Sequence, residues 1–286
     1  MSLPHVFGPL TGQVPLSYLD DDFNYLIMLV STTVAPVGTN DFLLALSGGS
    51  LTLQPINGNN VDINGTIYTY TAMPTLSPAA LTPATLYYIY LTDILSIPTL
   101  EASATGYTVD TVGRAYKTGD VTRRLMGIAY VVTGPAWANT STQRLVRSHA
   151  HRDRESLGMV NYFGDNRSTA SATFVELGLT TERIEWLQWA NESILIGMSG
   201  IGYNNTPGAA VRFNIAVNSG SATDAYSGFD AIATGPYMPF SASAAYLPGA
   251  DGHYNAEIMA QTSSGTVVAS GSSGSTVHTS IVGQIR

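Results

Sequence analysis

The sequence predicts a mainly β protein with one short N-terminal helix, and three observations predict it. Charged residues make up only 11% of the 286-residue chain, whereas the exposed faces of helices need Glu, Lys and Arg. Glycine (28 residues) and proline (14 residues) are frequent, as expected where many tight turns join strands. Short runs of β-branched and aromatic residues recur between those turns. A chain of this length is expected to form about two domains.

An N-terminal arm is expected over residues 1–40. Ser17 is a suitable helix N-cap, and Asp20, Asp21 and Asp22 follow it in the first turn, where carboxylates interact favourably with the helix dipole. Apolar residues continue as far as Val30, and a β-branched run then ends the pattern. The sequence therefore predicts a short helix around residues 18–30.

A small β module is expected over residues 41–148. Asn57-Gly58 and Asn64-Gly65 are strong signals for tight hairpin turns. Around them, runs of aliphatic, β-branched and aromatic residues are typical of strands. These runs are Leu51–Leu53, Ile67–Tyr70, Thr85–Leu91 and Leu125–Val132.

Residues 149–159 form a charged connector, where we place the domain boundary. The run His149–Glu155 holds the densest charge in the chain. The arginines in and before it could bind an acidic surface or a phosphate. A salt-bridged domain junction that involves Asp153 and Glu155 fits them better. These arginines are Arg144, Arg147, Arg152 and Arg154.

A second β domain is expected over residues 160–286. Its candidate strands recur about every 8–12 residues with Gly, Asn and Pro turns between them, which is typical of an all-β sandwich. No fixed-period repeat is visible, which argues against a solenoid or a propeller. The candidates are Ala172–Leu177, Arg183–Trp189, Ser193–Met198, Val211–Val217, Ala225–Ile232, Tyr237–Ala244, His253–Ala260, Thr266–Ala269 and Val277–Ile285.

Composition excludes several classes of function. The chain has no cysteine, so it has neither a disulfide scaffold nor cysteine-ligated zinc. Its net charge is −8 and no Lys or Arg precedes Arg114, which argues against nucleic acid as a partner. The N-terminus lacks the basic segment of a secretory signal, and the apolar stretch Leu26–Val30 is too short for membrane insertion. We expect no cofactor.

Several stretches of the predicted arm and module occur in an order typical of one family. They are Gly12–Asn24, Gly49–Pro55, Ile63–Gly65, Leu86–Tyr90, Leu100–Ser103, Lys117–Arg123 and Gln143–Ser148. The stretches after Asp41 resemble a β module of bacteriophage tail-fibre, head-fibre and other virion-appendage proteins. The stretch before it resembles the N-terminal opening of many phage structural proteins.

The resemblance implies a virion component on a phage tail or particle surface. It implies a homotrimer that attaches by its arm and presents a distal β domain to a host-surface glycan or protein. The C-terminal domain looks like a jelly roll, a fold common in capsid and lectin-like domains. Alternative functions are a capsid-decorating head fibre, a polysaccharide-degrading tailspike and a non-viral lectin-like adhesin.

The apolar side chains of the arm are the expected docking surface, because exposed apolar patches usually mark interfaces. They would insert into a groove of a tail adaptor, nozzle or portal-proximal protein. The acidic triplet that begins at Asp20 is expected to cap the helix, with docking as an alternative; three consecutive helical residues diverge too far to bind one ion. The docking residues are Leu16, Tyr18, Leu19, Asp20, Phe23, Leu26 and Ile27.

His149 and His151 are the candidates for a metal site. If the chain is extended there, alternate residues project to one face. In a three-fold assembly, three such pairs would offer six imidazoles to an octahedral ion, as in some trimeric phage spikes. The favoured alternative is a solvated linker without metal.

Two groups of polar and aromatic residues are candidates for receptor contact at the loop end of the sandwich. Tyr203, Asn204 and Asn205 lie in a stretch flanked by Gly and Pro, and Tyr246 precedes Asp251 and His253. Ordinary core or loop roles are the alternative for each residue.

The sequence offers no convincing catalytic constellation, so we expect no enzyme. Asp251 could orient His253, but no Gly-x-Ser-x-Gly elbow accompanies the pair. The carboxylates of the C-terminal domain offer no distinguishable pair for glycoside hydrolysis.

Overall fold

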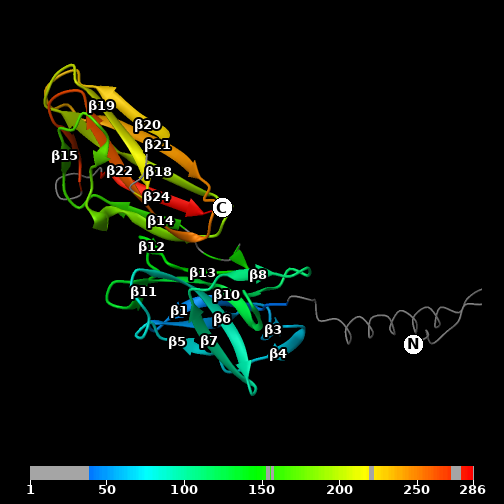
Figure 1. Cartoon of the computed structure of the whole chain (residues 1–286). Coiled ribbons are helices and arrows are strands. Elements are labelled where there is room, and N and C mark those ends of the chain that lie inside the picture. Colours follow the sequence, from blue (N-terminus) through cyan, green and yellow to red (C-terminus); the bar gives the residue numbers. More distant parts are fainter. Residues whose placement is uncertain (1–38, 153–154, 156–157, 219–221, 272–277, 286) are drawn as a thin grey trace, which may run out of the picture.

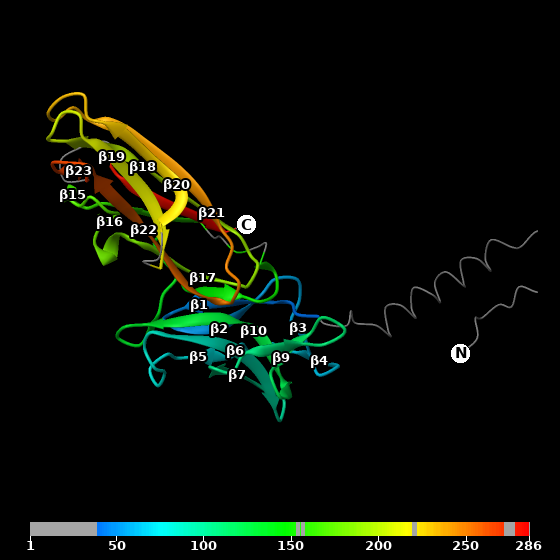
Figure 2. The same cartoon turned by 45° about the horizontal axis from the view of Figure 1, so that its top comes forward.

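The computed structural model describes residues 39–152, 155, 158–218, 222–271 and 278–285. Residues 1–38 of the predicted arm, with its helix at 18–30 and the docking residues from Leu16 to Ile27, lie outside these ranges. The described residues contain no α-helix and are mostly strands, which confirms the mainly β prediction. No helix among them has the length and hydrophobicity needed to cross a bilayer. Figures 1 and 2 show two stacked parts, an N-terminal β module and a C-terminal sandwich.

The β module contains strands β1 Phe42–Ser47, β2 Ser50–Pro55, β3 Asn60–Ile63, β4 Thr66–Thr69, β5 Thr75–Leu76, β6 Thr85–Ile94, β7 Ile97–Ser103, β8 Tyr107–Val109, β9 Ala115–Lys117, β10 Asp120–Val132, β11 Ala136–Trp137 and β13 Val146–Ser148. A small antiparallel sheet β1–β2–β5 and the hairpin β3–β4 contact a larger sheet in which β6 and β10 are central. Phe42, Leu51, Ile89 and Met126 are fully buried between these layers. Burial of such side chains stabilises the module by about 1.5–3 kcal/mol each.

The predicted Asn64-Gly65 turn is present and joins β3 to β4. Both residues have positive φ, 51° and 83°. This conformation matches the right-handed twist of the flanking strands, and Asn and Gly adopt it at low cost. Asp62 accepts a hydrogen bond from the Gly65 amide (2.7 Å), which fixes the turn.

The C-terminal sandwich consists of two sheets. Its main strands are β14 Gly158–Tyr162, β17 Ile184–Gln188, β18 Ile194–Asn204, β19 Ala210–Val217, β20 Ala222–Asp230, β21 Met238–Tyr246, β22 Gly252–Thr262 and β24 Ser280–Ile285. One sheet has the order β17–β22–β19–β20, and the other has the order β14–β24–β18–β21. Short strands extend them: β12 Gln143–Arg144, β15 Arg167–Thr169, β16 Val175–Glu176 and β23 Val267–Ala269.

The pairing of the eight main strands is nested. The first pairs with the last (β14 with β24), the second with the seventh (β17 with β22), the third with the sixth (β18 with β21) and the fourth with the fifth (β19 with β20), all antiparallel. A single long hairpin rolled into two facing sheets gives this order. It is the jelly-roll topology.

The core of the jelly roll lies between the two sheets. Ile196 and Phe240 face it from one sheet, and Trp186, Phe213 and Ile258 face it from the other. The rings of Phe213 and Phe240 stack at 3.8 Å with an interplanar angle of 10°, which joins the sheets at the centre. Alternation of buried and exposed residues along β18 and β21 places one face of each strand in this core.

The chain passes between the two parts more than once. After β11 in the module, β12 pairs in parallel with β17 of the jelly roll. β13 then returns to the module and pairs with β10, and β14 opens the jelly roll. The two parts are therefore connected by a strand, β12, that crosses from the module to the jelly roll, as well as by side-chain contacts.

Candidate functional site

The candidate residues predicted from the sequence divide between the two ends of the jelly roll. His149, His151, Asp251 and His253 lie at the junction with the module, whereas Asn205 lies at the other end. His253 is near the start of β22 and the opposite end of that strand is Thr262. Nine strand residues span about 30 Å. The two groups of residues predicted for receptor contact therefore do not form one surface.

Arg147 is the centre of the junction. Its side chain is fully buried, with 0% exposure. Its guanidinium donates to Glu155 (2.7 Å), to both carboxylate oxygens of Glu192 (2.8 and 3.1 Å) and to the carbonyl of Leu187 (3.0 Å). Burial lowers the pKa of Arg147, but the two carboxylates outweigh it and raise this pKa above its usual value. Of the arginines predicted to form a salt-bridged junction, Arg147 pairs with Glu155, and Glu192 is an additional partner. Arg144 and Arg152 donate to backbone carbonyls instead, and Asp153 and Arg154 lie outside the described residues.

A close approach of backbones positions Arg147. It lies on β13, which pairs with β10 opposite Gly127 and Ile128. A Cβ atom at Gly127 would lie 2.1 Å from the carbonyl oxygen of Arg147, so this position accepts only glycine without a backbone shift. β10 also has a bulge between Leu125 and Gly127. The glycine at position 127 and the bulge together allow β13 to place the guanidinium of Arg147 against the jelly roll.

Aromatic side chains surround this ion pair. Trp189 donates from its indole nitrogen to the carbonyl of Ser148 (3.1 Å). Tyr107 and His149 contact the Trp189 ring edge to face at 6.0 and 5.3 Å, and the Arg152 guanidinium lies 4.4 Å from its centre. Leu187 and Trp189 of the jelly roll belong to the same buried cluster as module residues. The junction is thus a continuous core, in which the two parts hold a fixed orientation.

The structure does not place His149 and His151 on one face. β13 ends at Ser148, and His151 has a φ of 56°, so the chain is not extended as the metal-site hypothesis requires. Burial, with Arg152 and Arg124 nearby, lowers the pKa of His149 to about 4. His151 instead bonds the carbonyl oxygen of Asn40 through Nε2 (2.5 Å). Within the described residues, no three His, Asp or Glu side chains are grouped to hold a metal ion.

Asp251 connects the two parts rather than lying free in a loop. One carboxylate oxygen accepts from the amide of Ala190 (2.8 Å), and the other is 3.3 Å from the hydroxyl of Tyr88 in the module. Burial and the negative charge of Asp251 raise the pKa of Tyr88 to about 12. Its contacts give Asp251 a structural role at the junction.

His253 lines an open pocket of about 360 Å³ between module and jelly roll. The Tyr130 ring stacks on its imidazole at 4.0 Å and 13°. Its Nε2 is 3.4 Å from Glu185, an ion-pair distance rather than a hydrogen bond, and Gln143 donates to the same carboxylate oxygen (3.0 Å). His253 first and then Gln143 lower the pKa of Glu185. Because a general acid needs a raised pKa, Glu185 suits polar binding better than acid catalysis.

At the distal end, the structure corrects the placement of two candidates. Tyr203 and Asn204 are the last residues of β18, not loop residues, and Asn204 is only 1% exposed. Its amide donates to Thr262 (2.8 Å) and its oxygen accepts from the Thr206 amide (2.7 Å), so it serves the fold and not a receptor. Asn205 is exposed beside it. Tyr246 ends β21 at the junction side, where it packs against Tyr254 at 5.5 Å.

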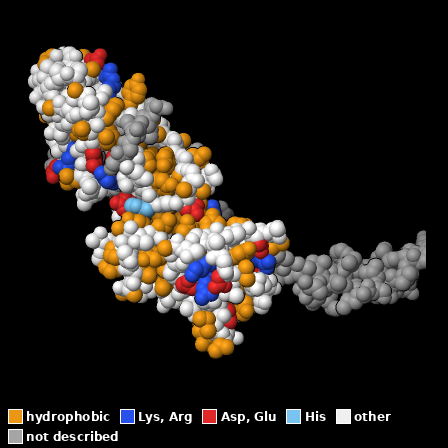
Figure 3. All heavy atoms as spheres, viewed as in Figure 1, with side chains coloured by type: hydrophobic (Ala, Val, Ile, Leu, Met, Phe, Trp, Pro, Cys, Tyr) orange, Lys and Arg blue, Asp and Glu red, His pale blue; other side chains and the backbone are white. Residues whose placement is uncertain are grey.

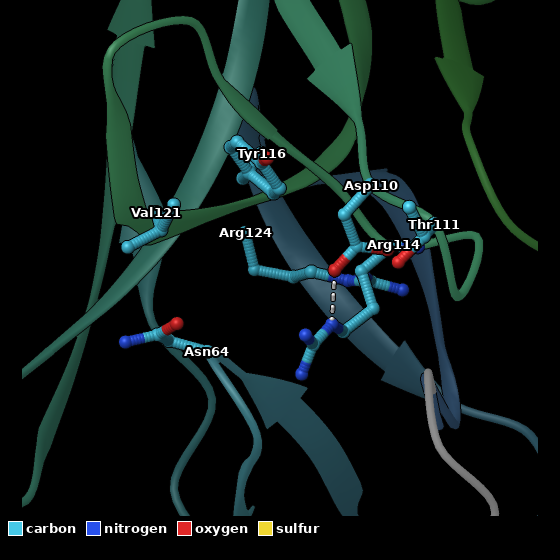
Figure 4. A pocket seen from close by; sticks show the side chains of 7 residues that line it. All are labelled: Asn64, Asp110, Thr111, Arg114, Tyr116, Val121 and Arg124. Carbon is cyan, nitrogen blue, oxygen red and sulfur yellow. Dashed lines mark hydrogen bonds and ion pairs between the residues drawn. The ribbon is translucent and has the colours of Figure 1, made fainter.

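A second pocket, of about 280 Å³, lies in the module and was not anticipated from the sequence. Figure 4 shows Arg114 and Arg124 side by side with Asp110. Arg114 pairs with Asp110 (2.6 Å) and with Asp62 (3.5 Å). Burial lowers the pKa of Arg124. Because the two arginines lie among two aspartates, the pocket carries little net charge, and these pairs tie the β3–β4 hairpin to the β8–β9 turn.

No protein-family model matches the chain, and no curated protein matches its sequence. Among solved structures, the chain is similar to a carbohydrate-binding module, CBM35 of Abf62 from Cellvibrio japonicus, with 12% identity, a TM-score of 0.24, and coverage of 45% of this chain and 96% of that one. It is also similar to infectious bursal disease virus, Gt strain, with 11% identity, a TM-score of 0.29, and coverage of 92% and 82%. Similarities at this level do not assign the chain to a family.

Proposed function

We propose that this protein is a structural component of a phage virion: a homotrimeric tail fibre or tail appendage that attaches by its N-terminal arm and presents its jelly roll to the host surface. The observation that carries the proposal is the buried junction, which holds an eight-stranded jelly roll rigidly at the end of the module that follows the arm. A binding domain on a rigid extension suits adhesion at a distance from a particle.

The junction favours a structural role over a catalytic one. Its ionisable groups are partners of one another: Arg147 pairs with two carboxylates, and Asp251 accepts two hydrogen bonds. Charged groups held in this way resist reorganisation and fix a geometry. The polar pocket at His253 is available for ligand contact, but its carboxylate is held ionised.

The distal loops are the receptor-contact surface in this proposal. The loops at 205–209 and 231–237 are tied together by the bonds from Gly208 to Ala231 (2.6 Å) and from Gly235 to Asn204 (3.3 Å). They present Ile232 and Tyr237, which are large exposed apolar residues, beside the exposed Asn205. Aromatic and amide groups of this kind suit contact with a glycan or a protein.

Labelled particles test the proposal. Antibodies against the jelly roll should decorate the tail of virions that carry the full chain, and virions whose gene lacks codons 2–38 should be unlabelled although the truncated protein is folded. Label on the capsid would make the protein a head fibre instead. Unlabelled full-length virions would refute a virion role. Release of oligosaccharides from host surface polysaccharide by purified protein would show a depolymerase and contradict a purely adhesive role.

A further inference from the structure

The two outer faces of the jelly roll differ in charge. Strands β14, β18, β21, β23 and β24 contain no Asp, Glu, Lys or Arg. The opposite sheet carries ion pairs on its outer side, including Arg183 with Glu257 (2.8 Å) and Arg212 with Asp230 (3.7 Å). We name the outward-facing residues of β14, β24, β18 and β21 the uncharged face.

The strand register shows which residues lie side by side on this face. One row across the sheet reads Val160, Val282, Gly197 and Ser243, from β14 to β21. In the next row Ser199 and Ser280 are paired, with their hydroxyls 3.1 Å apart. Gly, Ser, Ala and Val predominate in these rows, and the long side chains Tyr162 and Gln284 stand at the β14–β24 side of the face. Figure 3 shows apolar side chains gathered near the C-terminal end of β24.

We infer that the uncharged face is the surface through which copies of this chain associate; the inference rests on the homo-oligomeric body of the proposed function. A solvent-exposed face normally carries charges for solubility, whereas the centre of an interface is depleted of them. A neighbouring copy that packs on this face meets no like charge there and buries no unpaired ion of the face. Arg144 lies at its edge, where it donates to the carbonyl of Gly158, as expected for the polar rim of an interface.

The size of the face reaches the lower limit for a specific contact between proteins. Four strands span about 19 Å and nine residues of β18 span about 27 Å, so the face covers roughly 500 Å² per copy. Two copies would bury about 1,000 Å², which is the lower limit for a specific interface. A face on which short side chains predominate can approach another sheet to about 10 Å. Its composition and area therefore favour a second copy.

A matched pair of charge variants tests this inference in the full chain. Val282 is 44% exposed on the uncharged face, and Tyr226 is 64% exposed on the outer side of β20 in the opposite sheet. Val282→Glu should raise the dissociation constant of the oligomer by at least about a hundredfold, because it buries an unpaired carboxylate. Tyr226→Glu should leave the mass unchanged. Light scattering measures both, and an unchanged oligomer for Val282→Glu, or a monomeric unmodified protein, overturns the inference.

A labelling experiment remains informative if Val282→Glu fails to fold. The chain has no cysteine, so Ser243→Cys and Tyr226→Cys each introduce a single thiol. In the native oligomer a maleimide should modify the thiol of the Ser243→Cys variant at least about tenfold more slowly than that of Tyr226→Cys, and denaturant should abolish the difference. Equal native rates contradict the inference. An oligomer that does not bind virions would refute the virion proposal alone. A virion-bound oligomer with equal labelling rates at positions 243 and 226 would refute this inference alone.

Discussion

The guanidinium of Arg147 and the carboxylate of Glu192 form a two-point ion pair across the junction of the two parts, 45 residues apart in sequence, with Nη–Oε distances of 2.8 and 3.1 Å. A bidentate pair of this kind fixes direction as well as distance. It sets the angle at which the jelly roll leaves the module.

Removal of Arg147 should destabilise the whole chain. Arg147→Met leaves Glu155 and Glu192 without their shared cation in a buried place, which typically lowers the free energy of unfolding by about 3–5 kcal/mol. Arg147→Lys should recover only part of the loss, because an ammonium cannot form the bidentate pair. Denaturant unfolding measures both. Arg144→Met is the control, since Arg144 donates only to an exposed carbonyl at Gly158; an equal effect in both positions would argue against the buried pair.

Stability should fall between about pH 6.5 and pH 4, in part because of His149. Its pKa is near 4 when folded and about 6.5 when unfolded, so the unfolded chain binds the proton first as the pH falls. At about 1.4 kcal/mol per pKa unit, the loss of stability from His149 approaches about 3.5 kcal/mol below pH 4. Burial raises the pKa of Glu155, which acts in the opposite direction.

The comparison with His149→Gln isolates this effect. The variant should lose less stability than the unmodified protein between pH 7 and pH 4 when urea midpoints are compared. Identical slopes for the two proteins would show that His149 ionises freely in the folded state.

Asp251 should protect one particular amide from hydrogen exchange. Asp251→Ala removes the acceptor of the Ala190 amide and the partner of Tyr88, at a cost of about 1–3 kcal/mol. We expect faster exchange at Ala190 in this variant. Tyr88→Phe removes only the longer bond and should leave that amide protected. Slow exchange at Ala190 in Asp251→Ala would show that another group holds the amide.

The β6–β7 hairpin should become more stable with ordinary turn residues. Leu95 and Ser96 form its tip with φ of 54° and 64°, and Leu95 is 91% exposed. A left-handed conformation costs most residues about 1–2 kcal/mol, and Asn-Gly adopts this turn readily. Leu95→Asn with Ser96→Gly should therefore raise the free energy of unfolding by about 1–2 kcal/mol. A calorimetric melt checks this, and a loss of stability would mean that the Leu95 side chain has a packing role.

Local sequence patterns predict the strands well but not their partners. All nine strands expected after residue 160 coincide at least in part with observed ones, because β-branched and aromatic runs act locally. The nested order depends on pairings such as β14 with β24, which join residues more than a hundred positions apart. β14 itself was not expected, since Gly158–Tyr162 is short and follows the charged connector.

The candidate site shows where local reasoning fails. His149 and His151 have the spacing of a strand face, but the chain turns at His151, and alternation in sequence alone does not reveal a positive φ. Asn204 resembles a loop residue, yet it is buried by Thr262 and by the Ser264 carbonyl, which come from a distant strand end. Glu192 was missed as a partner of Arg147 for the same reason.

The pairing of β12 with the edge of the jelly roll has a practical consequence for the study of either part alone. A fragment that starts at Gly158 would lack the strand that covers the edge of β17, and a fragment that stops at Ser148 would carry that strand with nothing to pair. Either piece would present an open sheet edge, which invites aggregation. We therefore expect proteolysis and heat to act on the described body as one cooperative unit, with no soluble half released along the way.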